Sequence, residues 1–168
     1  MALKSDRYEL QTDISFFCDT VLDRGVVVVY QDSDGTGAAM DQGVAVVGCE
    51  VADSASVPAG ILLNDVVNKD LTRTHLNQHK DEVQKGGKVT VLRKGYVVTN
   101  AIEDGLSPDI HAGDVAYLSD ATSTSSGPGS TSEVGFLSNA AGTNGKVVGR
   151  FLSAKDADGY AKVEVNLP

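Results

Sequence analysis

His75 and His79 stand four positions apart, a spacing that would place two imidazoles on one face of a helix. Asp81 and Glu82 follow closely, so the pattern raises the question of a metal site. Such a site needs a third ligand at fixed geometry, and Leu76 stands where the metalloprotease signature has its glutamate. We therefore interpret these side chains as solvated polar residues, and we predict no metal and no other cofactor.

Two short acidic segments resemble the opening of a calcium-binding loop. Residues 32–35 read Asp-Ser-Asp-Gly, and residues 156–159 read Asp-Ala-Asp-Gly. Neither segment is followed by the bidentate glutamate that completes such a loop. Both are better interpreted as Asp-Gly turns, because glycine adopts a positive φ at little cost.

Catalytic groups are not visibly paired in the sequence. No Gly-x-Ser-x-Gly elbow is present, His111 stands alone in a loop pattern, and no two carboxylates suggest an acid and its base. Cys18 follows Phe16 and Phe17, which is typical of a small buried residue. Two cysteines do not make a disulfide framework, so Cys18 and Cys49 are expected to be reduced thiols. We predict that the protein is not an enzyme.

Composition excludes several classes of partner. The chain has 168 residues, a formal net charge of -9 and 41% hydrophobic but only 5% aromatic residues. An acidic protein repels phosphate backbones, so nucleic acid is not an expected partner. No stretch approaches the roughly 20 apolar residues that span a bilayer, and the first ten residues lack the apolar run of a signal peptide. We expect no membrane contact, and synthesis and folding in a cytoplasm.

Short apolar runs separated by turn residues predict a mainly β protein. Residues 25–30 form a valine run of strand length that suggests a strand buried on both faces, and residues 43–51 repeat the pattern. Residues 53–60 are interpreted as a loop. Residues 89–91 and 96–99 look like a hairpin that turns around Arg93, Lys94 and Gly95. Many short strands with turns between them favour a barrel or sandwich.

The end of the chain reads as two strands joined by an Asp-Gly turn. Ala161, Val163, Val165 and Leu167 alternate with polar residues, which is the period of a half-buried strand. The hairpin carries no reactive group. It therefore predicts a scaffold that acts through its surface.

The predicted organisation has three parts. Residues 1–19 form an N-terminal arm, residues 20–84 an N-terminal β region, and residues 85–168 a C-terminal β-barrel region. A short helix is plausible over residues 70–84, although a charged loop is an equal interpretation. Residues 119–132 are rich in Ser, Thr and Gly and are expected to form a flexible loop.

The first 19 residues contain apolar side chains without a clean period. An extended arm that packs on another subunit is one explanation, and an edge strand that covers the protein's own core is the other. From the residues alone, the edge strand is somewhat favoured. The apolar residues of this segment are Leu3, Tyr8, Leu10, Ile14, Phe16 and Phe17.

Several β segments together resemble a known family. They are residues 84–100 (QKGGKVTVLRKGYVVTN), residues 113–118 (GDVAYL), residues 148–152 (VGRFL) and the Asp-Gly hairpin that follows. This pattern is similar to that of the capsid decoration, or cement, proteins of tailed bacteriophages. The resemblance implies a small β-barrel or β-tulip-like domain with an extended N-terminal arm and little helix.

The same resemblance implies a function. The protein is expected to bind the major capsid protein on the outer surface of the mature virion, usually as a homotrimer, after synthesis in the host bacterial cytoplasm. It would stabilise the capsid by bridging neighbouring subunits, and the six apolar residues of the N-terminal arm are the expected contacts. Two other hypotheses remain. One is a head or tail appendage that binds a host glycan through residues 119–132, and the other is an enzyme subunit that uses His75 or His111.

Overall fold

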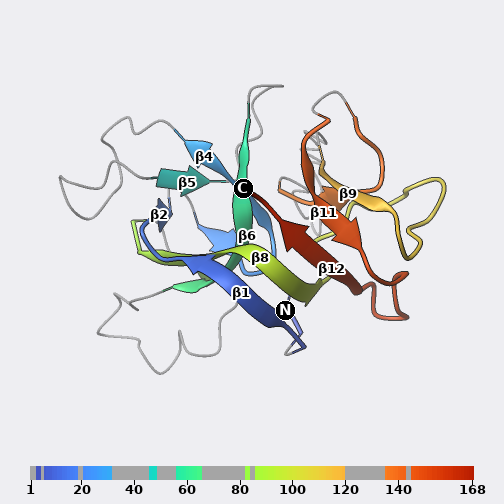
Figure 1. The fold of residues 1–168 in the computed structure, drawn as a ribbon, viewed down its shortest axis with the longest axis horizontal. Coiled ribbons are helices and arrows are strands. Elements are labelled where there is room, and N and C mark those ends of the chain that lie inside the picture. Colours follow the sequence, from blue (N-terminus) through green and yellow to red (C-terminus); the bar gives the residue numbers. More distant parts are fainter. Residues whose placement is uncertain are drawn as a thin grey trace, which may run out of the picture.

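The computed structural model describes residues 3–4, 6–18, 21–31, 46–48, 56–65, 82–83, 86–119, 135–142 and 145–168. The secondary structure in these ranges consists of β-strands, which confirms the predicted mainly β fold (Figure 1). No helix in the described ranges is long and apolar enough to cross a membrane. Most of residues 70–84, where a short helix was considered, lie outside the described residues.

One large sheet dominates the described structure. Ten strands follow the order β10-β9-β11-β12-β8-β6-β4-β5-β2, with β1 also paired to β8, while β3 and β7 form a separate pair. The strands are β1 (Tyr8–Asp13), β2 (Phe17–Cys18), β3 (Leu22–Asp23), β4 (Val27–Gln31), β5 (Val46–Gly48), β6 (Pro58–Asp65), β7 (Glu82–Val83), β8 (Val89–Thr99), β9 (Val115–Leu118), β10 (Leu137–Ser138), β11 (Val147–Phe151) and β12 (Ala161–Asn166).

Strand β8 connects two groups of strands. Its first residues, 89–92, pair with β6, and its last residues, 94–99, pair with β12. β1 pairs with residues 91–96 and overlaps both partners, so it must lie on the opposite edge of β8. In Figure 1, β9, β11 and β12 lie toward the end of β8 that pairs with β12, and β2, β4 and β5 lie toward the end that pairs with β6.

The hairpin predicted around Arg93, Lys94 and Gly95 is wrong, because β8 runs through these residues as one strand of 11 residues. The strand that pairs with β8 changes at this point, because β6 pairs with residues up to Leu92 and β12 pairs with residues from Lys94 onward. Gly95 has a φ of 141°, and a Cβ on it would lie 2.0 Å from the carbonyl oxygen of Tyr8. The glycine permits a close approach of two backbones rather than a turn.

The apolar residues form two clusters on opposite faces of the central strands. Cluster I consists of Val27, Val29, Ile61, Leu63, Leu92, Val97, Ile102, Ile110, Ala116, Leu118, Leu137, Val148, Phe151, Ala161, Val163, Val165 and Leu167. Cluster II consists of Cys18, Val26, Val28, Val47, Ala59, Leu62, Val83, Val89, Val91 and Ala101. Successive valines of β4 enter different clusters, which confirms the prediction of a strand buried on both faces.

The predicted terminal hairpin is confirmed as β11 and β12, which pair in antiparallel fashion. Asp156 shapes the turn, because its Oδ1 accepts the backbone N–H groups of Asp158 at 3.0 Å and Tyr160 at 2.9 Å. Gly159 follows with a φ of 83°, as expected for an Asp-Gly turn. The alternating residues from Ala161 to Leu167 are all 5% exposed or less.

Two further predictions about the strands have different outcomes. The loop predicted over residues 53–60 is wrong at its end, because β6 begins at Pro58. A proline is tolerated as the first residue of a strand, so Pro58 did not mark a break in the sheet. At the other end of the sheet, β2 touches the start of β8 through the bridge between Phe17 and Lys88. The described strands do not form a continuous closed ladder, so the barrel stays a prediction.

Candidate functional site

The N-terminal segment, defined here as residues 3–4 and 6–17, follows the whole length of β8. Leu3 forms a bridge with Thr99, β1 pairs with residues 91–96, and Phe17 forms a bridge with Lys88. Backbone hydrogen bonds from Lys4 N–H to the Val98 carbonyl and from Val89 N–H to the Phe16 carbonyl complete this pairing. In the single chain, the segment is therefore an edge strand on its own sheet.

The six predicted contact residues divide into two groups. Tyr8, Leu10 and Ile14 are exposed by 54%, 66% and 53%. Leu3 packs against cluster I, Phe16 packs against cluster II, and Phe17 is 9% exposed. The first group faces outward and is available to a partner, whereas the second group attaches the segment to the protein.

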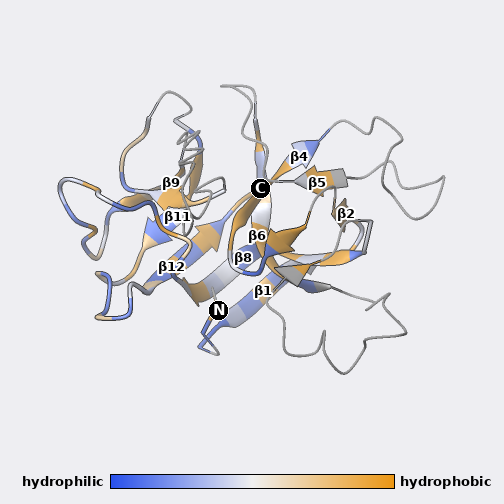
Figure 2. Ribbon diagram, turned by 180° about the vertical axis from the view of Figure 1, so that it is seen from behind, coloured by the Kyte–Doolittle hydropathy of each residue, from blue (hydrophilic) through white to orange (hydrophobic). Residues whose placement is uncertain are grey.

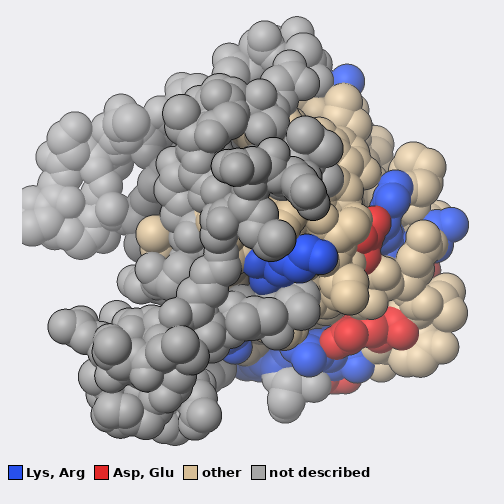
Figure 3. Space-filling view, turned by 90° about the vertical axis from the view of Figure 1, so that its left-hand side faces the viewer, with Lys and Arg blue, Asp and Glu red and all other residues tan. Residues whose placement is uncertain are grey.

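Two lysines attach the start of the segment to the β11–β12 hairpin in a reciprocal way. Lys4 of the segment places its Nζ 2.5 Å from Asp156 Oδ2 and 4.2 Å from the ring centroid of Tyr160. Lys162 of β12 places its Nζ 3.2 Å from Oδ2 of Asp6 in the segment. Asp158 Oδ2 also lies 3.9 Å from Lys4 Nζ, so each side gives the other a cation and at least one carboxylate. Basic and acidic side chains also lie next to each other on the described part of the face in Figure 3.

Aromatic rings strengthen the same contact. Lys162 Nζ lies 3.8 Å from the ring centroid of Tyr96, and Tyr96 stacks on Tyr8 with ring centroids 5.9 Å apart. Cation–π contacts at exposed sites contribute about 0.5–1 kcal/mol each. Tyr8 is therefore both an exposed side chain and part of the attachment of the segment.

The charged contacts shift the pKa values of their groups in the directions that favour pairing. The hydrogen bond to Asp156 raises the pKa of Lys4 above 10.5. The same hydrogen bond lowers the pKa of Asp156 below 3.8, helped by the backbone N–H of Tyr160. At the far end of β1, hydrogen bonds from Ser15 lower the pKa of Asp13. These groups are solvent-accessible, so salt screens their interactions.

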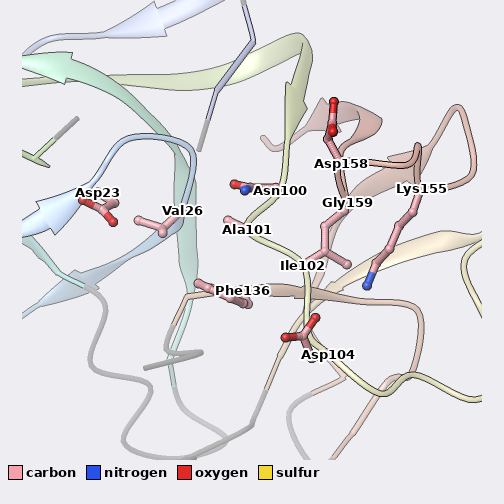
Figure 4. A pocket seen from close by; sticks show the side chains of 10 residues that line it. All are labelled: Asp23, Val26, Asn100, Ala101, Ile102, Asp104, Phe136, Lys155, Asp158 and Gly159. Atoms are coloured by element: carbon pink, nitrogen blue, oxygen red, sulfur yellow. The ribbon is translucent and has the colours of Figure 1, made fainter. Parts of the chain in front are cut away.

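A pocket of about 440 Å³, called the acidic pocket here, lies near the start of the segment. Its charged residues are Asp23, Asp104, Asp158 and Lys155, and the Lys155 Nζ donates to the Glu103 carbonyl at 3.1 Å. Figure 4 shows apolar side chains between Asp23 on one side and Asp158 and Lys155 on the other. No group of three or more His, Cys, Asp or Glu residues in the described ranges is placed to hold a metal ion.

A second pocket, of about 230 Å³, lies beside the last residues of the chain and is called the C-terminal pocket here. Sequence reasoning missed this pocket, because its lining comes from five separate segments of the chain. The pocket is lined by Tyr30, Val57, Pro58, Arg93, Lys146, Val147, Leu167 and Pro168.

A comparison with protein families shows which family the chain belongs to. A family model described as structural cement protein (E217 gp24/Pam3 gp6) matches residues 11–166, which is most of the chain. The chain belongs to this family. As a structural cement protein of phage capsids, it has a structural role in the capsid, and the predicted resemblance is confirmed. A comparison with curated proteins gave no match.

Of the other residues singled out in the sequence of this cement protein, only some lie within the described ranges. His111 is exposed, and its backbone N–H donates to Asp114 Oδ2 at 2.9 Å. Cys18 is buried, as expected from its neighbours. Most other positions that the sequence singled out lie outside the described residues. These are His75, His79, Cys49, the acidic segment 32–35 and residues 120–132 of the predicted flexible loop.

Proposed function

We propose that this cement protein binds the outer surface of the mature phage capsid and bridges neighbouring major capsid subunits. The family match over residues 11–166 carries the proposal. The N-terminal segment supports it, because Tyr8, Leu10 and Ile14 are exposed apolar residues on one continuous strand and its flank. Neither a cofactor nor a catalytic reaction has a part in the proposed role.

Capsid contact would bury these three side chains. Full burial of a side chain of this size stabilises a complex by roughly 1.5–3 kcal/mol. Leu3, Phe16 and Phe17 already pack against the protein's own clusters or are buried, so they would touch the capsid only if the segment left β8. The outward residues are therefore the proposed first contacts.

Stabilisation follows from selective binding. A ligand that binds the mature lattice and not its precursor shifts the equilibrium toward the mature lattice by mass action. Binding as a homotrimer would join several weak contacts, and the linked sites would act at a high effective concentration. The net charge of -9 is consistent with a position on the outer surface, away from packaged DNA and without a membrane partner.

The test is to mix the purified protein with mature and with immature shells of its phage and to measure occupancy by electron cryo-microscopy. We expect binding to mature shells only, at positions between neighbouring capsid subunits. Leu10→Ser should weaken binding, whereas Leu152→Ser should not, because Leu152 is 41% exposed but lies in the turn after β11. Mature shells that remain undecorated would rule out the proposal.

A further inference from the structure

The C-terminal pocket collects exposed apolar residues from distant parts of the chain. Eight large hydrophobic residues of the described ranges are exposed, and Tyr30, Val57 and Val147 all line this pocket. Their exposed fractions are 39%, 48% and 51%. Scattered exposed apolar residues need no explanation, but a group around one hollow is typical of a binding surface.

The charge of the pocket is opposite to that of the protein. Arg93 and Lys146 belong to the lining, and the lining contains no Asp or Glu. The protein as a whole has a formal net charge of -9. Arg93 is already paired with Pro168 and Asp13, so Lys146 is the cation of the lining that would meet a ligand combining an apolar group with a negative charge.

Arg93 is held in place at the pocket. Its Nη2 donates to a backbone oxygen of Pro168, and its Nη1 lies 3.9 Å from Asp13 Oδ2, so both Nη atoms have partners within the protein. The other oxygen of Asp13 accepts hydrogen bonds from Ser15. The Arg93 Nε is buried and makes no hydrogen bond to any residue that the structure describes. Because this nitrogen has almost no accessible surface, a ligand in the pocket would not reach it, and the contacts with Pro168 and Asp13 set the position of the side chain.

The pocket continues the surface of the N-terminal segment. Phe16 and Tyr30 pack together with ring centroids 5.5 Å apart, and Arg93 lies beside Asp13 at the end of β1. A partner that covers Ile14 is therefore close to the pocket. The volume of about 230 Å³ is below the roughly 300–1,000 Å³ of typical small-molecule sites. A protruding side chain suits this size better than a separate small molecule.

We infer that the C-terminal pocket receives an extended segment of the major capsid protein that carries an apolar residue next to a carboxylate. The apolar side chain would lie against Tyr30, Val57 and Val147. The carboxylate would pair with Lys146, and charge-assisted hydrogen bonds of this kind are about twice as strong as neutral ones. This inference rests on the proposed function, and it adds a second contact with its own chemistry.

Shell binding gives the first test. Val57→Ser, Val147→Ser and Lys146→Glu should each weaken binding to mature shells by about tenfold, which corresponds to about 1.4 kcal/mol. Leu152→Ser and Arg150→Glu are the matched controls, since both residues are exposed and neither lines the pocket. The controls should bind like the wild type. Pocket variants that also bind like the wild type would overturn the inference.

A peptide test does not depend on shells. The probe is N-acetyl-Ala-Leu-Glu-Ala-amide, and the control is the same peptide with lysine in place of glutamate. The glutamate peptide should shift the methyl NMR signals of Val57 and Val147 at millimolar concentration, and salt should reduce the effect. Equal shifts from the two peptides would overturn the inference. A wild-type protein that distinguishes the peptides but does not bind shells would count against the proposed function instead.

Discussion

Strands β1 and β12 lie on opposite edges of β8, and they are held there in different ways. β12 alternates between cluster I and solvent, so Ala161, Val163 and Val165 are almost completely buried. β1 is exposed on both faces along nearly its whole length. In Figure 2, the apolar colour is prominent on the strands around β12, whereas β1 is mostly hydrophilic.

The register and position of the two strands are therefore set by different interactions. A shift of β12 by one residue would turn its apolar side chains to water, so burial sets its register. β1 has no such constraint, and its pairing with β8 contains irregular register shifts around Gln11. It is held by backbone hydrogen bonds, by ring contacts and by exposed ion pairs. β1 should therefore leave β8 at a much lower cost in free energy than β12.

The largest effect is expected from truncating a buried side chain of β12. Val163→Ala removes two methyl groups from cluster I and leaves a cavity, so the free energy of unfolding should fall by roughly 2 kcal/mol. Leu10→Ala in β1 is the comparison, and its effect should stay within about 0.5 kcal/mol because Leu10 is exposed. Chemical denaturation measures both values. Equal losses would show that β1 is packed as firmly as β12.

A more local effect is expected at Gly95, which pairs with Val165 of β12 and with Glu9 of β1. In Gly95→Ala, the new Cβ meets the Tyr8 carbonyl, and the positive φ adds strain of about 1–3 kcal/mol. We expect β1 to separate from β8, so amide exchange should become faster in β1 and not in β12. Faster exchange in β12 alone would contradict the comparison.

Gly113→Ala is the control for this substitution. Gly113 has a φ of 101°, but a Cβ on it would meet no atom within 4 Å. It therefore introduces backbone strain without a clash. Amide exchange in β1 should remain as in the wild type.

The smallest effect is expected from the charges that attach the segment. The pKa of Asp156 is lowered from 3.8, so its contribution is present above that value and is lost as pH falls through the lowered pKa. The pKa of Lys4 is raised from 10.5, so its contribution is present below that value and is lost as pH rises through the raised pKa. The contact should be complete between these limits.

The ring of Tyr160 provides the measurement, because Lys4 lies over it. Its NMR signals should move when the pH falls from 6 to 2, and high salt at pH 6 should cause part of the same change. Lys4→Gln should remove the salt response and reduce the pH response, part of which remains because Asp156 also accepts the backbone N–H of Tyr160. Signals that titrate equally in the variant would show that another group is responsible.

The parts of the fold that bury side chains could be predicted from the sequence. The alternation after Ala161 and the valine run of β4 both reflect burial, and the structure confirms them. The turn assigned to Arg93-Lys94-Gly95 was wrong because a glycine that permits close backbone contact looks the same in sequence as a glycine in a turn. Only the position of β1 distinguishes the two cases.

The candidate surface was predictable to a smaller extent. The N-terminal segment has no hydrophobic period, and the structure supplies the reason, since neither face of β1 is buried. Tyr8, Leu10 and Ile14 could therefore be singled out as apolar residues that follow no hydrophobic period. The C-terminal pocket could not be found in this way, because Tyr30, Val57 and Val147 meet only after the sheet has formed.

The lengthwise pairing of the N-terminal segment with β8 has a mechanical consequence. A force along the strand direction acts on the backbone hydrogen bonds from Thr99 to Lys88 together, in shear. A force at right angles to the strand, applied at Leu3, would open the same bonds one after another. The segment should therefore resist tension along β8 far better than lifting from its end, and the direction of pulling would decide how much load the attachment bears.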